Sequence, residues 1–478
     1  MRLHVRAIGA VLLHGLFASA AAGQLAPGRA TIESLVFEPL IFEQPMVVEH
    51  QSLGVEVLLL ENHQLPIATV YAYFRGGYGL FEREIYAPAM GLPAMLRYGG
   101  TTTRSPASID EGLEYRAIQT TFGSAGGSIT STVNTLSEHL EPALDVWRDM
   151  LINPGFDEGE IRAWTGRQLE NVLRRKDDPS RLAFSEFNRL LYSDHPIGWE
   201  MDATDLAPDR VTADRFHEVH QRIVCRENLT LGVTGDVTWA EVEPLLLSLV
   251  DQLQPCEAEL PEAPVPNVRR EAGVFLIERE LEQSVIVMAH PTSVRLGDEP
   301  DYFSALIGNS VLGGGGFSSR LLSRLRTEEG YAYSASSLWT TPREHEGLLG
   351  AITRTQPENT IPAIAVILET MEELRHAPPT AGEVQTTVDQ IVNGFVFNFE
   401  TPGQIVSRNM FYRAQDLPTD WLQRYLSGVQ AVRPQDIQNV FAQHLRPDQM
   451  TILIVGDPDR IGRAELEALG PVTVLVIR

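Results

Sequence analysis

A pattern of strand, turn and helix occurs twice in this chain. The stretches NLTLGVTGDVTWAEVEPLLLSLV and QMTILIVGDPDRIGRAELEALG both read as a strand, a Gly-Asp turn and a helix. Their Gly-Asp pairs begin at Gly235 and Gly456, 221 positions apart. A second pair of helical segments, containing Pro142 and Pro362, is separated by 220 positions. Two independent matches at almost the same offset predict an internal duplication.

Each copy contains both strand-like and helix-like segments. In the first copy, residues 55–60 and 67–74 alternate as strands do. Residues 140–151 and 161–175 carry apolar side chains at helical spacing. So many helical runs do not fit a β-sandwich. The pattern therefore predicts an α+β fold built from two copies of one domain.

Length and composition set the domain organisation. A chain of 478 residues with 43% apolar residues is too long for one ordinary core. The segment PCEAELPEAPVPNVRR separates the copies and has four prolines, which is typical of an extended linker. We expect a signal peptide at 1–23, an N-terminal extension at 24–46, a first domain at 47–255, a linker at 256–270 and a second domain at 271–478.

The N-terminus has the layout of a secretory signal peptide. Arg2 and Arg6 precede an apolar run over residues 7–17, and small residues follow it. We expect removal near Ala22 or Gly23 and export to a periplasm or beyond. The remaining sequence has no uninterrupted apolar segment long enough to span a membrane.

The net charge narrows the classes of partner. A formal charge of -25 argues against nucleic acids and anionic membrane surfaces, because both require clustered Lys and Arg. Acidic side chains could favour cationic peptides if they gather around a binding site. The sequence does not indicate where they point.

The two cysteines, Cys225 and Cys256, are too few for a disulfide framework or for a zinc site of their own. They could pair in an oxidising compartment. Nothing in the sequence places them close together, so a disulfide is not expected.

Residues 312–335, LGGGGFSSRLLSRLRTEEGYAYSA, join a run of glycines to an arginine and a tyrosine seven positions apart. Leucines at helical spacing followed by Gly330 predict a helix with Arg326 near its end. Tyr333 falls on the extended segment that follows. By themselves, the two residues are most simply a helix-end cap and a half-buried strand aromatic.

This run resembles the C-terminal signature of the insulinase/pitrilysin-type zinc peptidases, the inverzincins. The resemblance rests on the glycine loop, Arg-Leu-Arg and Gly-Tyr-Ala-Tyr, and extends over about residues 47–478. It implies two homologous domains, each a mostly antiparallel sheet covered by helices, arranged as a clamp. It also implies that Arg326 and Tyr333 bind a peptide backbone, with Tyr333 helping to stabilise the oxyanion.

The glycine loop admits two interpretations. It could be a mobile lip that touches substrate, or a tight turn where helices of the two halves pack. The structural interpretation is the simpler one. The loop consists of Gly313, Gly314, Gly315 and Gly316.

The zinc motif of the inverzincins is missing at its expected place. The family carries His-x-x-Glu-His on a helix of the first domain, where two imidazoles hold zinc and the Glu is the general base. In GLPAMLRYGGT the histidine positions hold Ala94 and Tyr98, and the glutamate position holds Arg97. None of these side chains can do that work. A shift of register does not help, because no His occurs between His63 and His139. We therefore expect no cofactor on this chain.

Other ligand-type side chains are scattered. The third family ligand would fall at Glu170 or beside it at Asn171. The stretch FHEVHQ offers His217 and His220, which could share a helical face but lack the Glu-x-x-His arrangement. We interpret them as surface or half-buried helix residues, with metal binding as the lesser alternative.

The resemblance implies a shared mechanism. Bacterial two-subunit members and the mitochondrial processing peptidase place zinc on one subunit and other substrate-handling groups on its partner. We expect this chain to be the non-catalytic, substrate-binding subunit of a heterodimeric periplasmic zinc peptidase, inactive alone. Its partner would be a homologous chain with intact His-x-x-Glu-His. Two alternatives stay open: a scaffolding subunit with no part in proteolysis, and a self-sufficient metallopeptidase with an atypical site.

Overall fold

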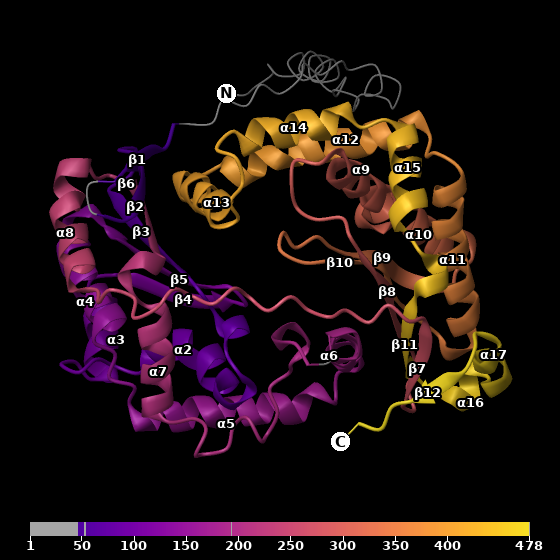
Figure 1. Ribbon diagram of the computed structural model, residues 1–478, viewed down its shortest axis with the longest axis horizontal. Coiled ribbons are helices and arrows are strands. Elements are labelled where there is room, and N and C mark those ends of the chain that lie inside the picture. The colour runs from indigo at the N-terminus through magenta and orange to yellow at the C-terminus, as the bar shows by residue number, and fades with distance from the viewer. Residues whose placement is uncertain (1–45, 52–53, 193, 478) are drawn as a thin grey trace, which may run out of the picture. The chain divides into compact units, whose positions relative to one another are not determined.

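The computed structural model describes residues 46–51, 54–192 and 194–477. Within the compact unit Gln44–Arg478, two β-sheets carry most of the helices (Figure 1). The predicted signal peptide and, apart from Met46, the predicted N-terminal extension lie outside the described residues.

The first sheet is built from strands that precede the predicted linker. Its neighbouring strands are antiparallel except β2 and β6, which run parallel. The residues of β3, IATVYAYFR, alternate between fully buried and more accessible positions, as expected when one face of a strand packs on the main core. In spatial order the strands are β1 (Val48–His50), β2 (Glu56–Glu61), β6 (Leu229–Gly235), β3 (Ile67–Arg75), β5 (Ser128–Leu136) and β4 (Gln119–Ala125).

The second sheet repeats the order of five of these strands with strands that follow the predicted linker. Its outer strand β12 differs, because it runs parallel to β7 whereas β1 is antiparallel to β2. β7 and β11 are parallel, like β2 and β6, while β8 to β10 form the antiparallel half. In spatial order the strands are β12 (Val472–Val474), β7 (Gly273–Glu278), β11 (Thr451–Gly456), β8 (Ser284–Thr292), β10 (Gly347–Thr355) and β9 (Ala332–Thr340). The matching topology confirms the predicted α+β duplication.

The helices follow the same duplication. Pro142 and Pro362 are each the third residue of a long helix, α4 and α11. In the first half the helices are α2 (Tyr86–Tyr98), α3 (Pro106–Tyr115), α4 (Leu140–Ile152), α5 (Glu158–Arg175), α6 (Pro179–Tyr192), α7 (Ala213–Ile223) and α8 (Trp239–Gln252). In the second half they are α9 (Pro300–Asn309), α10 (Arg320–Leu322), α11 (Thr360–His376), α12 (Ala381–Phe395), α13 (Pro402–Ala414), α14 (Trp421–Ala431), α15 (Pro434–His444), α16 (Pro458–Ile461) and α17 (Arg463–Ala468).

The two copies differ after their Gly-Asp turns. In the first copy β6 leads to the single helix α8, whose amino end is closed by a capping box between Thr238 and Glu241. In the second copy β11 leads to two short helices. Gly462, with a φ of +96°, separates them in a conformation that glycine adopts readily.

One helix of the first half covers the second sheet. β8 is buried along its whole length, and its two sets of alternating side chains belong to different clusters. Ile286 lies in the main core of the second half, whereas Val287 packs in a cluster with Leu182 and Phe187 of α6. A strand buried on both faces is typically rich in apolar residues, as β8 is over residues 285–289.

Helix α13 of the second half covers the first sheet in return. Val406 and Met410 cluster with Leu58 of β2. A Cβ at Gly232 of β6 would lie 2.4 Å from the sulfur of Met410, so glycine is required there for the helix to approach. Arg413 adds ion pairs to two acidic residues of the first half. Figure 1 shows α13 beside this sheet.

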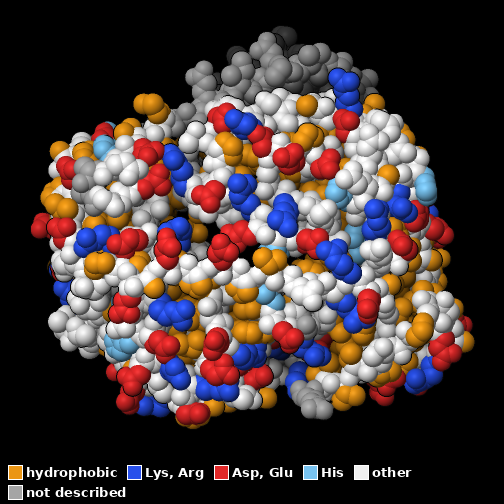
Figure 2. All heavy atoms as spheres, in the orientation of Figure 1, with side chains coloured by type: hydrophobic (Ala, Val, Ile, Leu, Met, Phe, Trp, Pro, Cys, Tyr) orange, Lys and Arg blue, Asp and Glu red, His pale blue; other side chains and the backbone are white. Residues whose placement is uncertain are grey.

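Acidic and basic side chains are intermixed on the face of the molecule that Figure 2 shows. The charge of -25 is therefore not gathered at one place on this face. No helix among the described residues combines the length and apolar content that crossing a bilayer requires.

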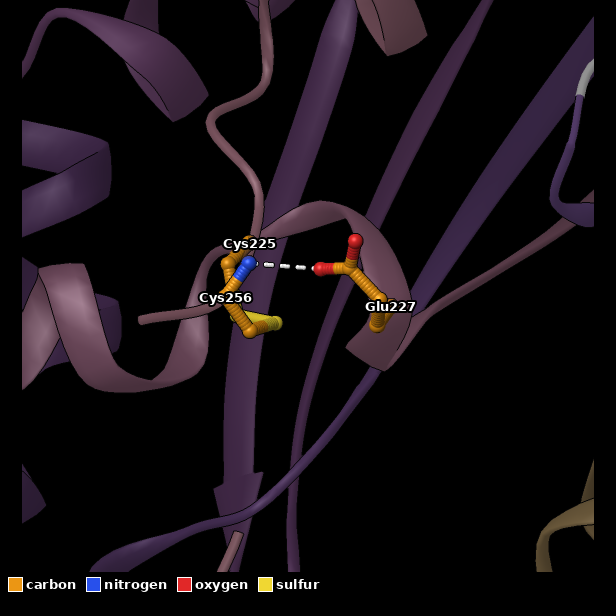
Figure 3. A group of neighbouring side chains, drawn as sticks. All are labelled: Cys225, Glu227 and Cys256. Carbon is orange, nitrogen blue, oxygen red and sulfur yellow. Dashed lines mark hydrogen bonds between the residues drawn. A yellow bond between two sulfur atoms is a disulfide. The ribbon is translucent and has the colours of Figure 1, made fainter. Parts of the chain in front are cut away.

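The structure corrects the expectation that Cys225 and Cys256 stay apart. They form a disulfide with a Cα–Cα distance of 5.0 Å (Figure 3). The backbone N–H of Cys256 also donates a hydrogen bond of 2.5 Å to Glu227. The linker is thus attached to the start of β6 at the point where it leaves the first half. The sequence could not show this, because the approach of α8 and β6 is a tertiary contact.

Replacing both cysteines with serine is expected to lower the free energy of unfolding by about 2–4 kcal/mol, because the disulfide closes a loop with a sequence separation of 31. Urea denaturation of the two proteins measures the difference. A reducing agent should destabilise the wild type and leave the double variant unchanged. Equal denaturation midpoints for both proteins would contradict a stabilising role.

Two buried histidines are held in the neutral form. His220 donates from Nε2 to the carbonyl of Leu151 at 2.7 Å. His290 lies 2.8 Å from the carbonyl of Pro291 through Nδ1, and its Nε2 accepts the N–H of Arg446 at 3.0 Å. Burial lowers the pKa of His220 and of His290 to about 4.

Stability is expected to fall as the pH drops from 6.5 towards 4, because only the unfolded chain takes up protons on these histidines in that window. Above pH 6.5 both histidines are neutral in the folded and the unfolded chain, so they do not lower the free energy of unfolding there. Replacing His290 with Gln should reduce the loss by on the order of 2 kcal/mol. Urea midpoints at pH 7 and pH 4.5 test this, with His376→Gln as the exposed control. Identical pH dependence of the wild type and His290→Gln would disprove the assignment.

Candidate functional site

The glycine loop packs against its own half. Helix α9 continues into a π-helical turn, Ser310–Gly314, and the chain then reverses at Gly316, whose φ is +64°. A Cβ on Gly313 would lie 2.2 Å from the backbone nitrogen of Ser337 in β9. The close approach of β9 therefore requires glycine here. The loop packs against a strand of its own half, whereas the structural interpretation expected helices of the two halves to meet there.

Arg326 lies on a short helical segment anchored by leucines. The segment consists of α10 and the π-helical stretch Ser323–Glu328, as the leucine spacing predicted. Leu321 and Leu325 are fully buried in the core of the second half. Gly330, with a φ of +67°, ends the segment. The buried leucines fix the helix so that Arg326 stays half-buried at the surface.

A β-bulge exposes Tyr333. Opposite β10, Thr355 pairs with Ala332 and Arg354 pairs with Ser334, so Tyr333 is skipped by the register. The bulge breaks the alternation of the strand, and Tyr333 and Ser334 are both exposed. The side chain of Tyr333 is 78% exposed, which rules out the half-buried strand aromatic considered above.

The structure brings Arg326 and Tyr333 together and adds Phe317. The guanidinium carbon of Arg326 lies 4.5 Å from the ring centre of Tyr333 and 5.2 Å from that of Phe317. Phe317 extends from the glycine loop and is 80% exposed. Cation–π contacts hold the three side chains in one group, which we call the Arg326 cluster. The sequence reasoning missed Phe317, although its place directly after the glycines was a signal.

Arg326 differs from the other arginines of its segment. Arg320 forms a two-pronged ion pair with Glu383, and Arg324 pairs with Glu373 at 3.0 Å. Hydrogen bonds from Arg320 lower the pKa of Glu383 to about 2. Within the described part of the chain, Arg326 has no acidic partner. Its N–H groups therefore remain available to a carbonyl oxygen or carboxylate.

The cluster stands at the free edge of the second sheet. β9 is the last strand in the spatial order and, among the described strands, pairs with β10 alone. An edge strand presents unpaired backbone N–H and C=O groups that another extended chain can use. Arg326 and Tyr333 border this edge. The arrangement can therefore bind a peptide in extended conformation.

The positions where the resemblance implies a zinc motif lie on α2, and their side chains make structural contacts. Ala94 packs on the core of the first half. Arg97 forms a 2.7 Å ion pair with Asp110 and lies over the ring of Tyr98. Trp164 of α5 contacts Gly91 so closely that a Cβ there would come within 2.7 Å of its ring. The helix pair α2 and α5 is thus kept while its ligand positions hold residues with structural contacts.

The alternative ligands are not brought into one site. Glu170 is exposed on α5 and pairs with Arg174 one turn on. His217 packs edge-on against Phe156, with ring centres 4.7 Å apart. His220 is buried and uses Nε2 for the carbonyl of Leu151. Each side chain has a structural partner, but the prediction of a surface or half-buried position is wrong for His220, which the packing of α7 on the first half buries.

One group of ligand-type residues does converge. Among the described residues, three or more such side chains meet only at Cys225, Glu227 and Cys256 (Figure 3). The two sulfurs are bonded to each other, so they do not offer the thiolates that bind metals. Glu227 accepts a hydrogen bond from the N–H of Cys256, which lowers the pKa of its carboxyl. The group therefore has a structural role, because the disulfide and this hydrogen bond hold the start of the linker against the first half.

Sequence comparison places residues 210–391 in the peptidase M16 inactive domain. Those residues of the chain are therefore similar to an M16 peptidase domain. This confirms the resemblance noted at residues 312–335. The chain is 21% identical to the non-peptidase homologue YmxG of Helicobacter pylori, over 87% of this chain and 95% of that protein. It is 23% identical to the uncharacterised zinc protease YmxG of Bacillus subtilis, over 74% of this chain and 85% of the relative.

Solved structures share the fold. An M16 inactive domain from Pseudomonas fluorescens superposes with a TM-score of 0.74 at 22% identity, covering 86% of this chain and 98% of that one. The periplasmic protease PqqL of Escherichia coli gives a TM-score of 0.74 at 13% identity, covering 89% of this chain and 48% of PqqL. The chain thus shares the fold of these structures, and its residues 210–391 are similar to an M16 domain of the inactive type.

Replacing Arg320 with Met should lower the free energy of unfolding by about 1–3 kcal/mol, because Glu383 loses its strongest partner while still partly buried. Chemical denaturation at pH 7 measures the change. Arg463→Met is the matched control, since Arg463 and Asp459 are 61% and 80% exposed and should contribute little. Equal effects of the two substitutions would contradict the anchoring role of Arg320.

Proposed function

We propose that this chain is the substrate-binding, non-catalytic subunit of an exported two-subunit zinc peptidase. One combination of features supports the proposal. The Arg326 cluster is exposed, lacks an acidic partner among the described residues and borders a free strand edge. The positions where the family holds zinc carry Ala94, Arg97 and Tyr98. The chain thus has groups that bind a peptide but not those that activate water.

In this proposal the peptide adds to the second sheet as an extended strand beside β9. Main-chain hydrogen bonds to the edge give affinity for any extended sequence. The guanidinium N–H groups of Arg326 donate hydrogen bonds to a substrate carbonyl. Phe317 gives the peptide an apolar surface beside the cation. The binding would therefore depend on backbone shape more than on the side chains of the substrate.

The partner subunit supplies zinc and the general base. A homologous chain with intact His-x-x-Glu-His would activate water at its metal. Tyr333 would then donate its hydroxyl hydrogen bond to the carbonyl oxygen as negative charge develops there. Such a donor acts in the transition state, so its loss affects turnover more than substrate affinity.

The disulfide supports an oxidising compartment. Disulfides persist in the periplasm and outside the cell and are rare in the cytosol. The bond between Cys225 and Cys256 therefore agrees with a leader at residues 1–23, which lies outside the described residues. We place the assembled peptidase in the periplasm.

Tyr333→Phe is expected to lower kcat of the complex about a hundredfold to a thousandfold with little change in KM, because one oxyanion donor is lost. The measurement is peptide turnover by the chain co-purified with a homologue carrying His-x-x-Glu-His. Tyr115→Phe is the matched control, since Tyr115 is 85% exposed and also lies under an arginine, Arg116.

Assembly must be shown to be intact in each variant by size-exclusion chromatography. Unchanged turnover by Tyr333→Phe would favour a scaffolding subunit. Zinc content of the separated subunits decides the other alternative. Stoichiometric zinc on this chain, together with activity of the chain alone, would favour a self-sufficient metallopeptidase.

A further inference from the structure

Away from the Arg326 cluster, a serine, a histidine and an aspartate from separate elements are linked in that order by hydrogen-bond contacts. Ser293 follows the end of β8, His444 is the last residue of α15, and Asp301 is the second residue of α9. The Oγ of Ser293 lies 3.1 Å from Nδ1 of His444. Nε2 of His444 lies 3.1 Å from a carboxylate oxygen of Asp301. Nothing in the proposed peptidase function uses these residues.

The carboxylate determines which imidazole nitrogen is free to act as a base. A carboxylate accepts hydrogen bonds, so Asp301 favours the tautomer with the proton on Nε2 of His444. Nδ1 then keeps its lone pair and accepts the hydroxyl hydrogen of Ser293. This is the arrangement that activates a serine: the base contacts the nucleophile, and a third group orients the base.

The three residues open into one cavity. A pocket of about 860 Å³ is lined by all three side chains. Ser293 is exposed, whereas the side chain of His444 is only 11% exposed. The nucleophile is thus accessible and the base is sheltered from water. Both signs of charge line the rest of the pocket, where two arginines lie with four further acidic residues: Arg295, Arg343, Asp298, Glu299, Glu344 and Asp416.

A purely structural role explains only part of this arrangement. An aspartate at the start of α9 and a histidine at the end of α15 each suit the dipole of their own helix, and their ion pair fastens the two helices. That role does not require an exposed serine hydroxyl on the second imidazole nitrogen. It also does not require all three groups to line one pocket.

We propose that Ser293, His444 and Asp301 form a second active site that hydrolyses small carboxylic esters. Ser293 Oγ attacks the ester carbonyl carbon as its proton passes to Nδ1 of His444. The bond from the carbonyl carbon to the alcohol oxygen breaks, and His444 returns the proton to the departing alcohol. Water then attacks the acyl-serine, giving the carboxylic acid and restoring the Ser293 hydroxyl. Asp301 is a positioning residue that orients His444.

The test is reaction of the purified chain with a fluorophosphonate probe, with the adduct located by mass spectrometry, and turnover of p-nitrophenyl acetate. A single adduct on Ser293 is expected. His444→Gln should slow its formation about a hundredfold or more. Asp301→Asn should lower kcat with little change in KM. Ser427→Ala, at an exposed serine lining a neighbouring pocket, should react as the wild type does.

Ser293→Ala removes only a surface hydroxyl, so its fold should persist and can be checked by circular dichroism. This variant should form no adduct and should lose the ester turnover. The proposal is overturned if the wild type forms no adduct at Ser293. It is also overturned if Asp301→Asn and a folded His444→Gln react at the wild-type rate. Peptidase activity of the assembled complex should be unaffected by Ser293→Ala, so the two sites are tested separately.

Discussion

An exchange of helices between the two halves determines how the rest of this protein is built. Helix α6 of the first half covers one face of β8, and helix α13 of the second half packs on β2 and β6. Each sheet therefore completes its apolar cover with a helix from the other half. Because the burial of these faces is shared, the two halves pack together within one compact unit.

The same duplicated architecture carries different chemistry at its two corresponding edges. β4 and β9 occupy equivalent ends of the two sheets. In the second half the edge has gained an exposed cluster, because a bulge turns Tyr333 outward and the buried leucines hold Arg326 beside it. In the first half α2 retains its contacts with α5, and its former ligand positions are occupied by a core contact and an ion pair. The contacts of α2 with its neighbours do not require zinc-binding side chains, so the fold at this place does not depend on a metal.

Within the second half, the arginines are divided between anchoring and binding. Arg320 and Arg324 are neutralised by carboxylates on α11 and α12. Arg326 is left to two aromatic rings, which hold a cation in place without satisfying its hydrogen bonds. A paired arginine has little capacity for a new ligand, because its donors are already used. The arrangement of acidic partners therefore decides which arginine of this run keeps hydrogen-bond donors free for a ligand.

The sequence by itself determined the duplication, the α+β class and the presence of side chains without imidazole or carboxylate at Ala94, Arg97 and Tyr98. These features depend on periodicity and residue identity, which local physical chemistry converts directly into strands, helices and missing donor atoms. Tertiary structure alone decided the disulfide between Cys225 and Cys256, the exposure of Tyr333 and the place of Phe317 in the cluster. It also joined Ser293 to His444, 151 positions along the chain. Such contacts depend on how whole elements approach one another, and no local pattern encodes that distance.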